Sequence, residues 1–185
     1  MNRSWAPLFM VAITGLVAIA CSSTPPPPPE PARNESELSA GTNTAWKQFL
    51  DADPSLKEVL DQAAGYAILP DITKAAAILG AAYGKGEVYE KGVKIGYCEL
   101  SMGSVGAQIG GEAYSELIVF HDQKALDEFK TGELKLSASA TAVALKPGAA
   151  RVANRTEGTS VFVRLKGGLM AEAAIGGQRI KFRPL

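Results

Sequence analysis

The sequence predicts an α+β fold, in which N-terminal helices pack on a curved, Gly- and Ala-rich antiparallel sheet of about six to eight strands, with one short inserted helix. Apolar residues recur at helical spacing before residue 65, and they alternate with polar residues at strand spacing after it. All but two of the 19 glycines lie between Gly65 and Gly177, among short runs of Ala, Val and Ile. Such strands are typical of an antiparallel sheet, and 185 residues suffice for one domain.

Two helices are expected at the start of this domain. Residues 43–50 carry apolar side chains at helical spacing, and Trp46 and Phe49 are expected to lie in the core. Asp53-Pro54 is typical of the N-cap and first position of a second helix, which we expect to end at Gly65.

A third, short helix is expected at residues 123–130, between two strands. Asp122 precedes it as a candidate N-cap, and Gly132 follows it as a candidate C-cap. Leu126 and Phe129 are spaced to point together toward the core.

Strands are expected where the alternation is clearest, at residues 104–109, 134–144 and 159–165. Along 134–144, Leu and Ala occupy one face, while Lys, Ser and Thr occupy the other. Small residues on an inward face indicate close backbone approach or tight curvature.

The N-terminus reads as a processing signal followed by a linker. Residues 1–20 combine a short basic start with an apolar run too short to span a bilayer, as in a signal peptide. Small residues precede Cys21, as at a lipoprotein cleavage site, so we expect acyl chains such as palmitate on Cys21. Ordinary cleavage beside an incidental cysteine is the alternative. Residues 21–41 are expected to form a Pro-rich linker and residues 42–185 the folded domain.

No group of residues indicates catalysis, so no catalytic residue, metal or cofactor is expected. The single histidine, His121, ends an apolar run, where a structural role is favoured. Cys98 shares a strand face with Leu100 and Met102, which predicts a buried and inert thiol. Residues 80–86 lack the spacing of a phosphate-binding loop. A net charge of zero gives no reason to expect nucleic acid.

The charges are unevenly distributed along the chain. Residues 22–134 hold 9 basic and 17 acidic side chains, whereas residues 135–185 hold 9 basic and 2 acidic ones. Such asymmetry favours an anionic partner, although the two halves could equally neutralise each other within the fold. Two alternating segments, expected to be neighbouring strands, supply five candidate headgroup ligands: Arg164, Lys166, Arg179, Lys181 and Arg183.

Four segments, in this order, resemble the SYLF domain family: residues 64–70 (AGYAILP), 80–86 (GAAYGKG), 103–111 (GSVGAQIGG) and 166–171 (KGGLMA). Eukaryotic SYLF proteins bind phosphoinositide membranes and some bind actin, whereas bacterial members are commonly secreted proteins or lipoproteins. The resemblance implies a non-catalytic lipid-binding module. In a bacterial periplasm its target is expected to be an anionic phospholipid, lipid A phosphate or another envelope component.

We therefore expect a lipoprotein that is anchored in the bacterial outer membrane through Cys21 and faces the periplasm or the cell surface. Ser22 after this cysteine resembles the sorting signal for the outer membrane. The domain is expected to bind anionic lipid headgroups and not to be an enzyme. The alternative is a structural lipoprotein that binds a cell-envelope protein or peptidoglycan, and the sequence identifies no particular protein partner.

Overall fold

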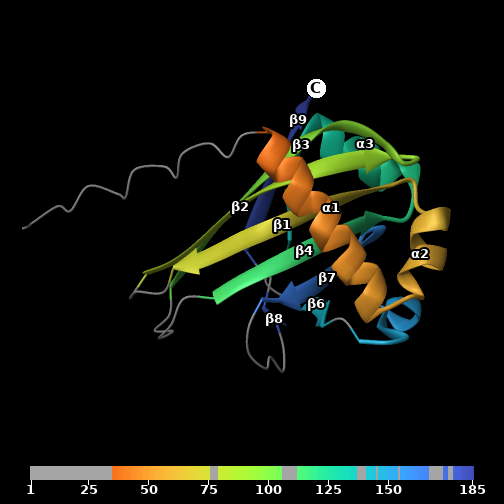
Figure 1. Cartoon of the computed structure of the whole chain (residues 1–185). Helices are drawn as coiled ribbons and strands as arrows, with labels where there is room; N and C mark the ends of the chain where they lie inside the picture. Colours follow the sequence, from red (N-terminus) through yellow and green to blue (C-terminus); the bar gives the residue numbers. More distant parts are fainter. Residues whose placement is uncertain are drawn as a thin grey trace, which may run out of the picture. The chain divides into compact units, whose positions relative to one another are not determined.

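A single mixed sheet organises the domain in the computed structural model (Figure 1). The structure describes residues 35–75, 79–105, 112–136, 141–144, 146–153, 155–166, 173–174 and 177–185. The expected signal peptide, Cys21 and the proline run at residues 25–29 lie outside these residues. Among the helices of the described ranges, none is long and apolar enough to cross a membrane.

Nine strands are seen within the described residues, in the spatial order β5-β9-β3-β2-β1-β4-β7-β6-β8. Their bounds are β1 Gly65–Ala75, β2 Leu79–Glu90, β3 Val93–Val105, β4 Glu112–Phe120, β5 Glu133–Lys135, β6 Thr141–Ala144, β7 Thr159–Leu165, β8 Ala173–Ala174 and β9 Gln178–Pro184. All pairs are antiparallel except β6 with β7. The predicted α+β class is therefore confirmed. The strand number exceeds the expected six to eight, because two strands, β5 and β6, represent the one expected at 134–144, and β8 is too short to show alternation.

The expected long strand at residues 134–144 is represented by β5 and β6, and residues 137–140 between them lie outside the described part. Most of the expected strand at 104–109 lies outside it as well. The strand at 159–165 is confirmed as β7. Its alternation separates two buried faces, because Val161 and Val163 face one core cluster and Phe162 faces another.

Helix α1 (Glu35–Ala52) lies on the outer face of the sheet over β1 and β2 (Figure 1). It starts at least eight residues before the expected residue 43, because Leu38 and Thr42 continue its buried stripe. Phe49 is fully buried, as predicted, whereas Trp46 is half-buried. The side chain of Ser39 ties α1 to β2 by donating to the buried Glu87 Oε1 at 2.6 Å.

Helix α2 (Leu56–Gln62) differs from its prediction at both ends. Ser55 is its N-cap residue and Ala63 its C-cap, while Gly65 already belongs to β1. Asp53 is fully buried and accepts hydrogen bonds from Gly148 N at 2.9 Å and Ala150 N at 2.8 Å. Asp53 therefore holds the start of the short 3-10 helix η1 (Ala149–Val152), and its side chain also accepts from Ser55 N at 3.0 Å. The predicted cap position is wrong by two residues, because Ser55 and not Asp53 is the N-cap residue of α2.

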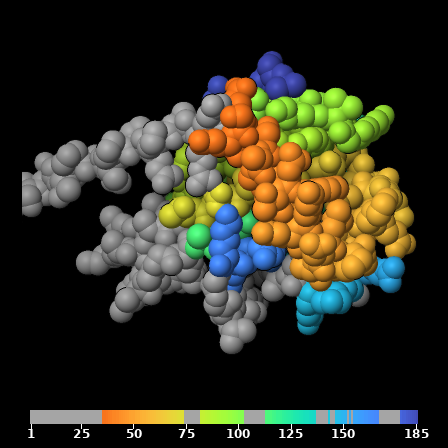
Figure 2. Space-filling model, in the orientation of Figure 1, coloured from red at the N-terminus to blue at the C-terminus, as the bar shows by residue number. Residues whose placement is uncertain are grey.

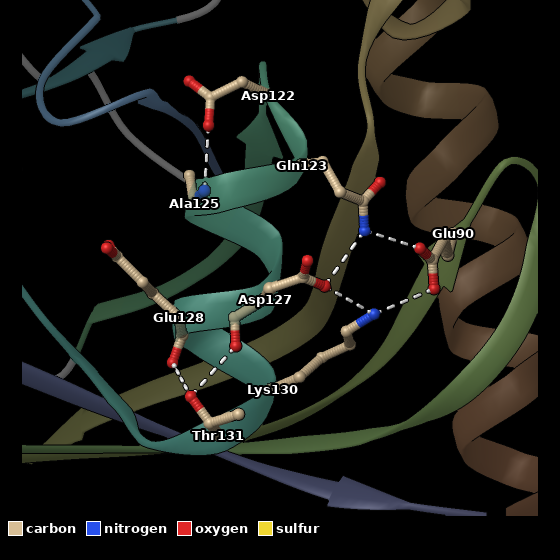
Figure 3. Close-up of polar contacts among 8 residues, drawn as sticks. All are labelled: Glu90, Asp122, Gln123, Ala125, Asp127, Glu128, Lys130 and Thr131. Carbon is tan, nitrogen blue, oxygen red and sulfur yellow. Dashed lines mark hydrogen bonds and ion pairs between the residues drawn. The ribbon is translucent and has the colours of Figure 1, made fainter.

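Helix α3 (Gln123–Thr131) forms as predicted, with Gly132 at its C-cap. Asp122 Oδ1 accepts from Ala125 N at 2.9 Å, and Leu126 and Phe129 are buried. Figure 3 shows how Glu90, at the end of β2, holds this helix by accepting from its side chains. The donors are Gln123 Nε2 at 2.9 Å and Lys130 Nζ at 3.2 Å.

The core has two clusters, one on each face of the sheet. The inner cluster gathers side chains from most of the strands and from α3, including Leu69, Ile118, Phe120, Phe129 and Ile180. The outer cluster lies beneath α1 and α2 and includes Phe49, Leu56, Ile68, Leu117 and Phe162. Because both faces of the central strands are buried, β1 and β4 carry nearly continuous apolar runs.

Candidate functional site

Strand β9 presents three basic side chains on one exposed face. Gln178 and Ile180 point inward and are buried, so the strand period of two places Arg179, Lys181 and Arg183 outward, and all three are exposed. On one side β9 pairs with β3, and on the other with the short strand β5.

The neighbouring strands extend this surface. Lys135 lies opposite Arg179, so the basic face of the sheet, as defined here, comprises Lys135, Arg179, Lys181 and Arg183. Two carboxylates lie among them. Glu99 accepts from Arg183 Nη1 at 3.3 Å, and Glu133 Oε2 is 3.9 Å from Lys135 Nζ.

Arg179 and Lys181 form no ion pair with any residue that the structure describes. Glu99 is also shared with Lys85, whose Nζ lies 4.0 Å from Glu99 Oε1, so it is already neutralised by other cations. The basic face therefore keeps an excess of positive charge that is open to solvent.

Arg164 and Lys166 do not join this face, and the expectation that the five cations lie on neighbouring strands is wrong. Strand β7 is separated from β9 by β3, β2, β1 and β4. Arg164 donates to Gln48 Oε1 on α1 at 2.9 Å, and Lys166 forms an ion pair with Asp71. These two cations are held by the fold itself.

Lys135 was not predicted as a candidate headgroup ligand, because its neighbour in the sheet, Arg179, is distant in sequence. Its alternation with Leu134 and Leu136 shows that it points outward, but nothing local indicates the pairing of β5 with β9. Strands that are consecutive in sequence usually lie side by side, and this rule would place residue 135 away from β9.

A buried polar cluster lies on the inner face of the sheet. Glu116 is fully buried, and its Oε2 accepts from Gln178 Nε2 at 3.1 Å. The same amide nitrogen of Gln178 donates to the hydroxyl of Tyr114 at 3.2 Å. Burial raises the pKa of Glu116 to about 7, although the hydrogen bond from Gln178 acts to lower it. The only sequence signal for this cluster is that Glu116 shares a strand face with Ile118 and Phe120.

The two other candidate chemical groups are Cys98, which is buried, and His121, which is half-buried. Cys98 is fully buried and free, as predicted, and burial raises the pKa of its thiol. His121 Nε2 lies 2.8 Å from Ser160 Oγ, but Ser160 is only 2% exposed, so this hydroxyl is not accessible to a substrate. Among the described residues, no group of three or more His, Cys, Asp or Glu could hold a metal ion.

The acidic residues at α3 have structural partners, and Figure 3 shows those of Asp122 and Asp127. Asp122 caps the helix, as predicted, and Asp127 Oδ1 lies 2.9 Å from Lys130 Nζ. Glu128 forms an i,i+4 ion pair with Lys124 at 3.7 Å. These contacts stabilise the helix itself.

The fold and its basic face define a small α+β domain with an exposed, positively charged strand. Residues 101–184 match the Ysc84 family model, described as Las17-binding protein actin regulator, which bears out the resemblance to SYLF proteins. The chain is also similar to "Beta cell expansion factor A" of Aeromonas veronii, with 29% identity over 148 residues. That match covers 78% of this chain and 56% of the relative, so the chain spans little more than half of the relative's length.

Proposed function

We propose that this protein is a lipid-anchored protein of the bacterial outer membrane, whose SYLF domain binds anionic lipid headgroups through the basic face. One observation carries the proposal: Arg179 and Lys181 are exposed and have no ion-pair partner in the described part of the chain. Lys135 and Arg183 lie beside them and enlarge the positive surface.

The strength of such an interaction follows from the number of cations near the membrane. Each Lys or Arg close to an anionic surface contributes about 1 kcal/mol of attraction, which decays within a Debye length of about 8 Å at physiological salt. Three or four cations on one strand pair act together, because the backbone that carries them is already ordered before binding.

The proposed anchor is Cys21, in the segment expected to carry the signal peptide and linker. Two or more acyl chains would hold the protein stably at the membrane, and the linker would let the domain reach the lipid surface. The similarity of residues 101–184 to the Ysc84 family supports a lipid-binding role. The actin-related description of the family model is not carried over to this chain.

We propose no catalytic role for the domain. The one histidine and its serine neighbour are engaged inside the fold, and the thiol of Cys98 is buried. Binding alone accounts for the exposed charges.

Vesicle sedimentation tests the proposed function. A Cys21→Ser protein, which lacks the acyl acceptor, is mixed with phosphatidylcholine vesicles with and without phosphatidylglycerol. We expect binding only to the anionic vesicles, and we expect it to weaken as salt is raised. Equal sedimentation with both vesicles, or none with either, would contradict headgroup binding. In that case, sedimentation with isolated peptidoglycan would support the structural alternative.

A further inference from the structure

A second surface feature, remote in sequence from the basic face, is a pocket of about 570 Å³ between α1, α2, the start of β1 and the β2–β3 turn. Figure 2 shows this side of the molecule, where α1 and α2 (orange) meet the green strands. The volume lies within the range of about 300–1,000 Å³ that is typical of small-molecule sites.

One wall of the pocket is apolar. Helix α1 contributes Trp46 and Leu50, which are one turn apart, and α2 and the residue after it contribute Leu60 and Ala63. All four side chains are half-buried and pack against the outer core cluster.

Stacked rings keep this wall in place. The ring of Trp46 stacks on that of Tyr66, with centroids 5.0 Å apart and 22° between the planes. Tyr66 in turn stacks on Tyr89, with centroids 5.1 Å apart and 18° between the planes. A ladder of three rings from α1, β1 and β2 has little freedom to collapse, so the pocket is preformed.

Among the charged side chains that line the pocket, one cation has no ion-pair partner within the described residues. Lys57 Nζ pairs with Asp61 Oδ2 at 2.8 Å, so these two side chains neutralise each other. Lys91 is exposed and forms no ion pair with the residues described. It stands in a tight turn with Gly92, at φ values of 50° and 79°, which is the type I′ geometry that fixes the end of a hairpin.

A second donor lies in the same pocket. The hydroxyl of Tyr66 has no hydrogen-bond partner within the described residues, and burial raises the pKa of this group. Lys91 and Tyr66 can both donate to an anionic acceptor, whereas Trp46, Leu50, Leu60 and Ala63 offer only apolar surface and one indole N–H.

We propose that this pocket binds a single-chain amphiphile with a carboxylate head, of the fatty-acid class. The acyl chain lies against Leu50, Leu60 and Ala63, and the carboxylate is held by Lys91 Nζ and the Tyr66 hydroxyl. This site is separate from the basic face and does not depend on the function proposed for it.

Titration with sodium dodecanoate, below its micelle concentration, tests this proposal. The protein is the expected mature chain from residue 21 with Cys21→Ser, in which Trp46 is the one indole, so its fluorescence reports on the pocket. We expect saturable binding that weakens by about fourfold for each methylene removed from the chain, which is the effect of burying one CH₂ group. Lys91→Gln should weaken dodecanoate binding by about fivefold, as for one partly exposed charge pair. The same change should leave the neutral alcohol dodecan-1-ol unaffected.

Three variants complete the design. Ala63→Phe fills the pocket and should abolish binding of both acid and alcohol, while Lys124→Gln on α3 removes an exposed cation elsewhere and should change nothing. The Arg179→Gln/Lys181→Gln/Arg183→Gln protein should bind dodecanoate as the parent does. The loss of dodecanoate binding can therefore be told apart from the loss of headgroup binding. Should Ala63→Phe not fold, Lys91→Gln on the exposed turn still decides the question. Absence of dodecanoate binding, or binding that is insensitive to Lys91→Gln, would overturn the proposal.

Discussion

Gln178 on β9 donates a hydrogen bond to Glu116 on β4 at 3.1 Å, although β3, β2 and β1 lie between these two strands in the sheet. Adjacent strands are about 4.8 Å apart, so a flat sheet would separate β9 from β4 by about 19 Å. The contact therefore shows that the sheet curls and closes its inner face around Glu116. Ile180 and Phe129 pack into the same interior.

The ionisation of Glu116 is predicted to make stability depend on pH. Burial raises the pKa of Glu116 to about 7 in the folded protein, from an ordinary value of 4.5. Because the folded state holds the proton more tightly, the stability that this group contributes is fully present below the unfolded pKa and is lost as pH rises through the folded pKa. The full loss is on the order of 3 kcal/mol. Chemical denaturation at about pH 5 and pH 8 should show this fall for the parent and not for Glu116→Gln.

The matched control for this prediction is Glu99→Gln. Glu99 lies on the outer face of β3, with its side chain 35% exposed, so it should retain the pH dependence of the parent. If Glu116→Gln and the parent lose stability in parallel between the two pH values, Glu116 is not the titrating group.

Asp53 is predicted to be one of the most sensitive polar residues of the fold. Its buried carboxylate accepts from Ser55 N at 3.0 Å and Ser55 Oγ at 2.7 Å as well as from the start of η1. Burial alone would raise the pKa of Asp53, but these hydrogen bonds hold it below its usual range. Asp53→Ala leaves several donors unpaired and should lower the free energy of unfolding by about 2–4 kcal/mol. Asp61→Ala, which removes an exposed ion pair with Lys57, should lower the free energy of unfolding by less than about 1 kcal/mol. Equal losses of stability in the two variants would contradict this role of Asp53.

Two glycines with similar positive φ values, Gly92 and Gly158, allow the cost of backbone strain to be separated from the cost of steric contact. Gly92 and Gly158 have φ values of 79° and 74°, so alanine at either position should cost about 1–2 kcal/mol of strain. A Cβ at Gly158 would lie 2.6 Å from Asp122 Oδ2, whereas a Cβ at Gly92 meets nothing within 4 Å. Gly158→Ala should therefore destabilise the protein by about 1–3 kcal/mol more than Gly92→Ala in thermal or urea unfolding. Equal effects would show that the loop at Gly158 yields without disturbing the cap of α3.

Acylation of Cys21 is predicted from the residues around it. The intact mass of protein from the membrane fraction should show a mature chain that begins at Cys21 and carries acyl groups. Cys21→Ala should release the protein from membranes. A mature chain of unmodified mass that begins at another residue would exclude the lipoprotein assignment.

The features that sequence predicted well are those whose signals are local. Helix α3 has its cap, its inward residues and its final glycine within eleven positions, and all of them lie where expected. The inward and outward alternation of β9 is equally local. By contrast, Asp53 bonds to residues more than 90 positions away, and this partner choice is decided by tertiary packing.

In the candidate site, too, the local features were predicted from sequence and the long-range contacts were not. Sequence placed Arg179, Lys181 and Arg183 on one face, because strand alternation requires it. It could not show that Arg164 lies against α1, or that Lys135 lies beside Arg179, because strand order in a sheet depends on long-range pairing.

The most direct measurement of the central claim compares two triple variants in binding to anionic vesicles, both in the Cys21→Ser background. Arg179→Gln/Lys181→Gln/Arg183→Gln should weaken binding by roughly two decades, at about 1 kcal/mol per cation. Lys47→Gln/Lys124→Gln/Lys146→Gln removes the same charge from exposed positions outside the basic face and should have a much smaller effect. Equal binding by the parent and both variants, or equal losses in both, would contradict a headgroup site on β9.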